Sequence, residues 1–198
     1  MQYKNPTTTN AARAEATRNA LVGAARTLFA AKGYAETSTP EIVVAAGVTR
    51  GALYHHFEDK VALFRAVVTA EYQAVARLIN ATADQSDGSM IDTLRQGSRG
   101  YIDAMKDQGR VRIMLRDGPA VLGQSALDTI DRATSADTLR RGLAQAMQAG
   151  QITALPLDAL TTQLSALFDR AALAISEGGD PDDHLAVLDA ILACLVRR

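Results

Sequence analysis

Polar side chains beside a tight turn are the residues of this chain best suited to chemistry. Thr49 and Arg50 stand where a helix is expected to begin. The first turn of a helix that lies in the major groove of B-DNA reaches the base edges, and an arginine there can bond bidentately to guanine. Gly51 and Ala52 are small enough for close approach to a base or for contact with a thymine methyl. Thr49 and Arg50 are therefore the leading predicted base readers.

The neighbouring polar residues suit the phosphate backbone. Tyr54, His55 and His56 carry hydrogen-bond donors on the same segment. Lys60 lies near the start of the following helix, where free amides also favour anions. The predicted DNA-binding residues are Ser38, Thr39, Thr49, Arg50, Gly51, Ala52, Tyr54, His55, His56 and Lys60.

Two short helices joined by a turn must position these side chains. Ser38 followed three residues later by Glu41 has the pattern of a capping box, which opens a helix. Gly47 suits the left-handed conformation that ends a helix. Leu53 and Phe57, four residues apart, share the buried face of a second helix. The pattern predicts a helix-turn-helix, whose second helix reads the major groove.

Residues 15–72 resemble the N-terminal domain of the TetR family of bacterial transcriptional regulators. The resemblance rests on AARTLFAAKGY at 24–34, Thr37-Ser38, AAGV at 45–48, LYHHF at 53–57, Lys60 and Leu63. The chain departs from the family at Pro40, which removes a possible phosphate-contacting side chain. The resemblance implies a dimeric, all-helical, ligand-responsive repressor that binds a palindromic double-stranded DNA operator and is released by a small-molecule effector.

Other functions find less support in the sequence. His55 and His56 are adjacent rather than four residues apart, and no cluster of acids or cysteines accompanies them, so we expect no metal site and no cofactor. Asp183-His184 could belong to a catalytic triad, but the chain has no GxSxG segment and no glycine-rich phosphate loop. We expect no enzyme. A helical ligand-binding module without specific DNA binding remains the alternative to the repressor.

Composition limits the remaining possibilities. With 198 residues, 47% of them hydrophobic, the chain can bury a sizeable core. It has no apolar run long enough to span a membrane and its N-terminus does not resemble a signal peptide, so we expect a cytoplasmic protein without membrane contact. The single cysteine, Cys194, excludes an internal disulfide and is expected to be a packed thiol.

Charge is divided unevenly along the chain. Residues 1–77 hold nine Lys or Arg against six Asp or Glu, a net charge of +3. Residues 78–198 hold twelve against sixteen, a net charge of −4. The first part is therefore the better partner for a polyanion, although a net charge of +3 also suits an ordinary solvated surface.

The expected fold is all-α, because helical periodicity covers almost the whole chain and no alternating strand pattern is evident. We expect a flexible tail at 1–14, a helix-turn-helix domain at 15–60 and a ligand-binding and dimerisation domain at 61–198. A long helix at 59–83 is expected to transmit a ligand signal to the DNA-binding head. The other expected helices span 17–33, 90–107, 110–116, 125–149, 156–177 and 182–197, with a polar loop at 83–89 and a break at Gly118-Pro119.

The last two expected helices bear on assembly. The segment 184–196 is apolar nearly all the way round, with only Asp189 interrupting, so it must be covered on more than one side. In the preceding helix, Gln163, Arg170 and Glu177 mark the solvent side. Both helices are either internal core or part of a four-helix interface between two copies, as the family resemblance implies. We expect a homodimer, with Leu164, Phe168, Leu188, Ile191, Leu192 and Leu195 at its interface.

A ligand pocket is expected in the C-terminal domain, where aromatic and flexible apolar side chains mix with few polar groups. Ordinary core packing is the alternative for any one of them. Asp169 lies in the apolar run ALFDRAALAI, off the solvent line of Arg170, and therefore faces either the pocket or a surface edge. The predicted pocket residues are Tyr72, Leu94, Tyr101, Met105, Ile113, Met114 and Asp169.

Overall fold

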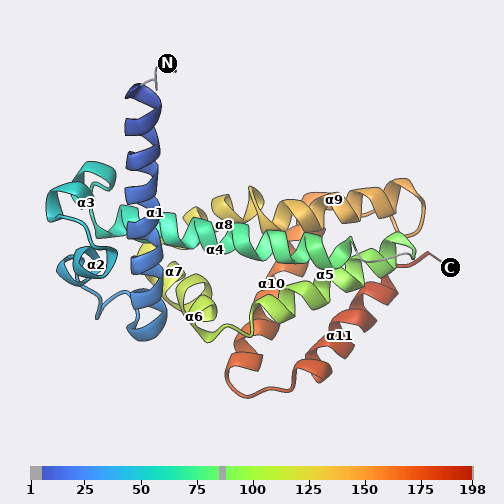
Figure 1. Ribbon diagram of the computed structural model, residues 1–198. Coiled ribbons are helices and arrows are strands. Elements are labelled where there is room, and N and C mark those ends of the chain that lie inside the picture. The colour runs from blue at the N-terminus through green and yellow to red at the C-terminus, as the bar shows by residue number, and fades with distance from the viewer. Residues whose placement is uncertain (1–5, 85–87, 198) are drawn as a thin grey trace. The chain divides into compact units, whose positions relative to one another are not determined.

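The computed structural model describes residues 6–84 and 88–197, and it is built of helices throughout this part of the chain (Figure 1). The predicted all-α fold is confirmed. Contacts divide the chain into two compact units, one ending at Thr69 and the other beginning at Ala70. This division falls inside one long helix. Of the expected tail, residues 1–5 lie outside the described residues, as do residues 85–87 of the expected polar loop.

The first unit is a small helical head. It contains α1 (Pro6–Lys32), α2 (Thr39–Ala46), α3 (Arg50–His56) and the start of α4 (Lys60–Ala83). Helices α2 and α3 pack on each other and on α1. The rings of Phe29 and Phe64 meet edge to face with centroids 5.1 Å apart, and Tyr34 lies 4.9 Å from Phe64. This aromatic cluster joins α1 to the start of α4 in the interior of the head.

Helix α1 begins earlier than the sequence analysis expected. It starts at Pro6 rather than near Thr17, so residues 6–14 are helical and do not form a flexible tail. Proline is favoured in the first turn of a helix, where its missing N–H costs nothing. The alanine-rich segment from Ala11 to Ala16 then continues the helix, since alanine has the highest helix propensity.

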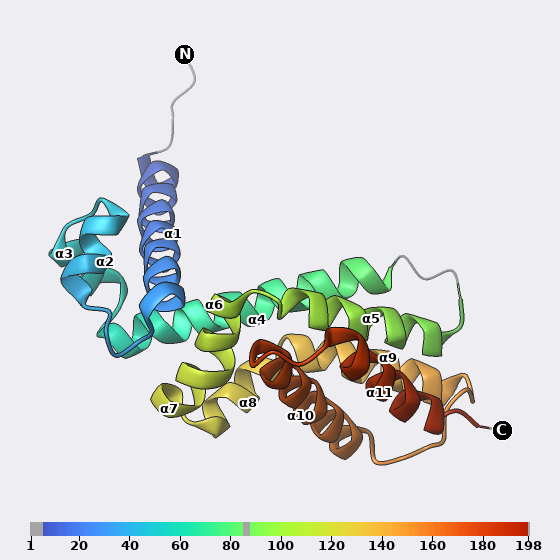
Figure 2. The ribbon, with the colours of Figure 1, turned by 90° about the horizontal axis from the view of Figure 1, so that it is seen from below.

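The second unit is built around α5 (Met90–Ala104), which packs against α9, α10 and α11. Its other elements are α6 (Gln108–Val111), the π-helix η1 (Arg112–Asp117), α7 (Gly118–Leu122), α8 (Gln124–Arg132), α9 (Ser135–Gln148), α10 (Leu157–Ser176) and α11 (Pro181–Cys194). Figure 2 shows α10 and α11 side by side. Gly100 of α5 lies against α4, and a Cβ there would come within 3.2 Å of the Ile79 Cα atom.

Two expected helix boundaries are wrong. The helix expected over 125–149 is divided into α8 and α9, because the Thr134 hydroxyl donates to the Ile130 carbonyl and the Ala136 amide donates to the Asp131 carboxyl. These side chains replace backbone helix bonds at the junction. Gly118-Pro119 does not interrupt the helical conformation, because α7 follows η1 directly. Gly118 keeps right-handed helical angles, and Pro119 stands in the first turn of α7, where it needs no donor.

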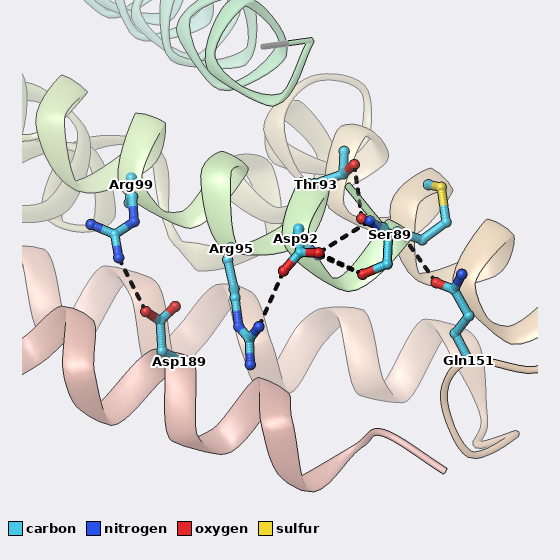
Figure 3. A network of polar contacts seen from close by, with 8 residues as sticks. Ser89, Asp92, Thr93, Arg95, Arg99, Gln151 and Asp189 are labelled. Atoms are coloured by element: carbon cyan, nitrogen blue, oxygen red, sulfur yellow. Dashed lines mark hydrogen bonds and ion pairs between the residues drawn. The ribbon is translucent and has the colours of Figure 1, made fainter. Parts of the chain in front are cut away.

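A polar network fixes the start of α5 and ties it to two later segments (Figure 3). Ser89 and Asp92 form a capping box, and the Met90 amide donates to the side-chain oxygen of Gln151 over 3.0 Å. Arg99 of α5 donates to Asp189 of α11 over 3.4 Å. Asp189, the one charged residue that interrupts the apolar pattern of α11, therefore faces a neighbouring helix of the same chain.

A buried ion pair joins α4 to α6. The Arg110 Nε atom donates to the Glu71 carboxylate over 2.7 Å, and the same guanidinium donates to the Ala104 carbonyl over 2.6 Å. The two charged side chains are only 13% and 8% exposed. A charge held this far from water depends on its partner, because an uncompensated buried charge is costly.

Removing one member of this pair should destabilise the second unit. We expect Arg110→Met to lower the free energy of unfolding by about 3–5 kcal/mol, since Glu71 would stay buried without its cation. The double variant Glu71→Met/Arg110→Met should recover part of this loss. Chemical denaturation of the variants at one protein concentration measures both effects.

Arg140 supplies the matched control. It pairs with Asp158 where the side chains are 48% and 84% exposed, so Arg140→Met should cost at most about 1 kcal/mol. Equal losses for Arg110→Met and Arg140→Met would contradict a structural role for the buried pair.

Candidate functional site

The α2–turn–α3 segment has the capping that its sequence predicts. Ser38 and Glu41 form both bonds of a capping box, and Glu41 also accepts from Lys32. Gly47 has φ 66°, in the left-handed region, and ends α2. The Thr49 hydroxyl then accepts from the Ala52 amide over 3.2 Å and caps α3. Local hydrogen bonds therefore fix both the turn and the first residue of α3.

One face of α3 packs inward and another carries polar side chains outward. Leu53 and Phe57 are buried, as predicted. A Cβ added at Gly51 would meet nothing closer than 3.9 Å, so the surface there is open. Among the predicted DNA-binding residues, Ser38, Thr49, Arg50, Gly51, Tyr54 and His55 are exposed, and Thr39, Ala52, His56 and Lys60 are partly buried.

Tyr54 organises the polar face in a way that the sequence analysis missed. The Arg50 guanidinium lies over its ring, 5.5 Å from the centroid. Hydrogen bonds to its hydroxyl lower the pKa of Tyr54, and the bond from Thr39 contributes more than the bond from Arg50. Tyr54 thus holds an α3 arginine and an α2 threonine together. The four-residue spacing of Arg50 and Tyr54 was the available signal, because such residues are neighbours on a helix.

Lys60 differs most from its predicted role. Its ammonium donates to the carbonyls of Tyr34 and Thr37, each over 2.8 Å, and lies 4.0 Å from the centroid of the Tyr34 ring. Burial lowers its pKa. Two carbonyls that the loop leaves without helical partners use this cation, so Lys60 stabilises the head from inside. Replacing it would disturb the head and would not report on a phosphate contact alone.

The second unit has a partly open cavity of about 200 Å³ between α4, α5, α8, α9 and α10. Tyr72, Leu94, Tyr101 and Asp169 are the predicted pocket residues that line it. Met105, Ile113 and Met114 are buried in the core and are not on its wall. Sequence periodicity does not distinguish the two positions, because core and cavity side chains share the same helical spacing. The wall also contains Asp84, Asp131, Ser135, Thr138, Arg141, Gln145, Ser165 and Phe168, which were not predicted.

Two carboxyl groups dominate the electrostatics of this cavity. The Tyr101 hydroxyl donates to Asp169 over 2.5 Å. Burial raises the pKa of Asp169 to about 6, partly offset by the Tyr101 bond. Burial, followed by repulsion from Asp169, raises the pKa of Asp131 to about 7. Burial and the nearby Asp169 also raise the pKa of Tyr101 well above its ordinary value. The cavity therefore brings partly buried acidic groups together.

Four of the six predicted interface residues face the interior of the single chain. Leu164, Phe168, Leu188 and Leu192 are buried in the second unit, and Phe168 lines the cavity. These side chains fill the core between α10, α11 and their neighbours, and their contribution to an interface between copies stays a prediction. Ile191 and Leu195 are partly buried. Sequence periodicity gave no way to tell the inner face from the outer one, since both are apolar.

The outer faces of α10 and α11 carry their own apolar residues. Leu167 is 41% exposed and Val187 is 58% exposed. Cys194 is exposed in the single chain, contrary to the packed thiol that was expected. We call this surface the outer α10–α11 face; it consists of Ala166, Leu167, Ala186, Val187, Ala190, Ala193 and Cys194. Gln163, Arg170 and Glu177, the predicted solvent side, are exposed as expected.

Neither a metal site nor a membrane-spanning helix is found in residues 6–84 and 88–197. No group of three or more His, Cys, Asp or Glu side chains in this part of the chain is arranged to hold a metal ion. No helix in the same residues has the length and hydropathy needed to cross a membrane.

Both units match a known family. Residues 21–67 match the family described as bacterial regulatory proteins, tetR family. Residues 91–197 match the family described as tetracyclin repressor-like, C-terminal domain. Together these matches cover the candidate DNA-binding segment and most of the cavity wall.

Individual proteins show the same likeness along most of the chain. An HTH-type transcriptional repressor of Mycobacterium tuberculosis, Rv1474c, is 29% identical over 178 residues, which cover 89% of this chain and 91% of that protein. The crystal structure of a TetR-family transcriptional regulator from Pectobacterium atrosepticum is 31% identical, covers 94% of this chain and 97% of its own, and has a TM-score of 0.76. RolR in complex with resorcinol has a TM-score of 0.73 at 21% identity, covering 94% and 90%, and shares the fold.

The buried carboxyl of Asp169 should make stability depend on pH. Its pKa in the folded state, about 6, lies above the value of about 3.9 for an unfolded aspartate, so the folded state binds the proton more tightly. The stabilisation from that proton is complete below about pH 4 and is lost as the pH rises through about 6. Relative to that of wild type, the free energy of unfolding of Asp169→Asn should therefore rise by roughly 3 kcal/mol between pH 4 and pH 8. Urea denaturation across this range measures the gain.

Asp103→Asn is the matched control, because this carboxylate is exposed and pairs with Lys106 on the surface of α5. The difference in free energy of unfolding between Asp103→Asn and wild type should change little over the same pH range. If the difference in free energy of unfolding between Asp169→Asn and wild type did not depend on pH, the pKa of the Asp169 carboxyl would not be raised in the folded protein.

Proposed function

The chain belongs to the TetR family of bacterial regulatory proteins, and from that premise we propose that it is a cytoplasmic transcriptional repressor. It binds a palindromic operator as a homodimer and releases it when a small molecule occupies the cavity of the second unit. The observation that carries this proposal is the polar face of α3, which a capped turn leaves exposed on a packed head. It is a regulator and not an enzyme, in keeping with its family.

The DNA-binding part of the proposal rests on the first turn of α3. Thr49 and Arg50 begin this helix and are exposed, and Gly51 leaves open space beside them. The N-terminal residues of a recognition helix contact base edges in helix-turn-helix proteins. We assign base reading to Arg50 and its neighbours, and phosphate contacts to Ser38, Thr39, Tyr54 and His55, whose side chains carry donors at the same surface.

The ligand-binding part rests on the cavity of about 200 Å³. Its wall combines aromatic rings with a few polar groups, as small-molecule sites do. RolR, which shares this fold, is known in complex with resorcinol. We assign the effector of this chain to the corresponding kind of site, within the domain proposed over 61–198.

The regulatory part requires that effector and operator prefer different states of the protein. A ligand shifts an equilibrium only by its differential affinity for the two states, and the coupling is reciprocal. Helix α4 runs from Lys60 to Ala83 and contributes residues to both units, including Tyr72 on the cavity wall. We propose that α4 carries the signal from the cavity to the head proposed over 15–60.

The dimer is proposed to form through the outer α10–α11 face. Leu167 and Val187 project from it, and its other members are alanines and one cysteine, with no charged side chain among them. Contiguous exposed apolar surface is typical of interfaces between proteins. Two copies that pair by a two-fold axis would cover the same surface on both, and their recognition helices would then match the two halves of a palindrome.

Arg50→Ala tests the reading function. The variant should lose preference at one base position per half-site and bind the operator about 1–3 kcal/mol more weakly, because a bidentate guanine contact would be removed. Anisotropy titrations against a panel of operators, each with one base pair changed, measure the preference. Arg140→Ala removes the same charge from the second unit and should leave the preference intact. An Arg50→Ala protein with the wild-type preference would exclude Arg50 as a base reader.

Val187→Glu tests the dimer. A carboxylate in the middle of an apolar interface would be buried without a partner, so the variant should be monomeric and remain helical. Light scattering at micromolar protein concentration gives the mass, and circular dichroism gives the helix content. Val44→Glu makes the same change at an exposed valine of the head and should stay dimeric. A monomeric wild type, or a dimeric Val187→Glu protein, would contradict the proposed interface.

A further inference from the structure

We propose that the cavity of the second unit takes a small organic cation, an amine or quaternary ammonium group on an aromatic or aliphatic body. This inference rests on the proposed function, because it gives the chemical class of effector for the same cavity. It follows from the charges, the unused hydrogen-bonding capacity and the aromatic rings of the cavity wall.

The charged groups that face the cavity are mostly acidic. Asp131 of α8, Asp169 of α10 and the exposed Asp84, which follows α4, are on its wall, and Asp128 lies close enough to raise the pKa of both Asp131 and Asp169. Arg141 of α9 is the one basic residue among those that line it. Its guanidinium is already paired with Asp137 over 3.0 Å, on the same helix. The wall therefore has an excess of negative charge when its carboxyls are ionised.

Neither central carboxyl has a cationic partner among the residues that the structure describes. Asp169 accepts from the Tyr101 hydroxyl, and Asp131 accepts from the Ala136 amide over 3.1 Å. Each of these bonds uses one carboxyl oxygen, which leaves the second oxygen of each group free for a ligand. Two basic side chains line the adjoining hollow: Arg140 pairs with Asp158, and Arg132 is exposed. Buried carboxylates without a counter-ion are costly, and a bound cation would remove that cost.

Aromatic rings supply the second half of the site. Tyr72, Tyr101 and Phe168 all line the cavity, and the rings of Tyr101 and Phe168 are 5.6 Å apart at 51°. Aromatic faces attract cations, and the attraction is stronger in a desolvated site than at a surface. Carboxylates that accept hydrogen bonds, together with aromatic rings, are thus suitable partners for an alkylammonium group. The same groups disfavour an anion, which would meet Asp131 and Asp169.

The size of the cavity limits the ligand. About 200 Å³ is below the roughly 300–1,000 Å³ of sites for drug-sized molecules, so a single-ring amine is the appropriate scale. A second, larger hollow of about 870 Å³ shares Tyr72, Asp131, Ser165 and Asp169 with the cavity. The two central carboxyls therefore lie where the cavity and this hollow meet.

The test uses matched probes that differ in charge. Tyramine, 4-ethylphenol and 4-hydroxyphenylacetate share one ring and carry a cation, no charge and an anion. Benzyltrimethylammonium with benzyl alcohol, and cyclohexylmethylamine with cyclohexylmethanol, extend the comparison to other shapes. Calorimetry and thermal unfolding on the full-length protein at pH 8 measure binding. At least one cation should bind tenfold or more tightly than its uncharged partner, and the anion should bind weakest.

Variants assign the effect to the carboxyls. Asp169→Asn and Asp131→Asn keep the acceptor for Tyr101 or for the Ala136 amide, so both should fold. Each should weaken cation binding tenfold or more and leave the affinity for the uncharged probe unchanged. Asp103→Asn, at an exposed position of α5, should change neither affinity. Equal or tighter binding of the uncharged probes, or cation binding that is unaffected in both cavity variants, would overturn the inference. So would the absence of binding by every cation.

Operator binding keeps this inference separate from the proposed function. If uncharged probes bind and cause release of operator DNA while the cations do neither, the inference of a cationic ligand is overturned. The proposed repressor function is then supported. Cations that bind through Asp169 without changing operator affinity would support the inference and overturn the effector role of the cavity. Both readouts come from the same protein preparation, so neither failure can be mistaken for the other.

Discussion

Packing of α2 and α3 on α1 and on each other is the interaction on which the candidate DNA-binding surface depends. These helices have eight and seven residues, and helices of that length are not stable alone in water. Leu53, Phe57 and Ile42 bury their inner sides, and Lys60 binds the loop carbonyls that follow α1. Because packing and capping hold the segment in place, its outer side chains are not needed for folding and can serve to contact DNA. Arg50 and Thr39, gathered around Tyr54, occupy that outer side.

The second unit follows a different rule, since its distinctive residues are polar groups inside the fold. Glu71 and Arg110 neutralise each other across α4 and α6. Asp131 and Asp169 have no such partner among the described residues, although they are enclosed by α8, α9 and α10. Uncompensated carboxyls reduce stability as the pH rises, and proteins keep such groups where a function uses them. The contrast between the paired and the unpaired acids is what makes the cavity a candidate site and not merely an imperfection of packing.

Features set by neighbouring residues could be predicted from the sequence, and features set by distant ones could not. The capping box at Ser38, the left-handed Gly47 and the cap at Thr49 involve residues three or four apart, so their patterns are visible in the chain. Lys60, in contrast, binds carbonyls 23 and 26 residues away. The division of α8 from α9 depends on side-chain bonds of Thr134 and Asp131 that compete with a helical pattern. In α10 and α11 both faces are apolar, so Leu188 and Leu192 could not be told from Val187 by periodicity. Tyr101 and Asp169, 68 residues apart, were each named for the pocket, but their bond required the fold.

The most direct test of the central claim is to select binding sites from random double-stranded DNA with the full-length wild-type protein and sequence what is retained. The account predicts an inverted repeat of two half-sites, bound by one dimer with an affinity that falls steeply as salt increases. Retention of no preferred sequence, or of a single half-site without a repeat, would contradict a dimeric operator-binding regulator.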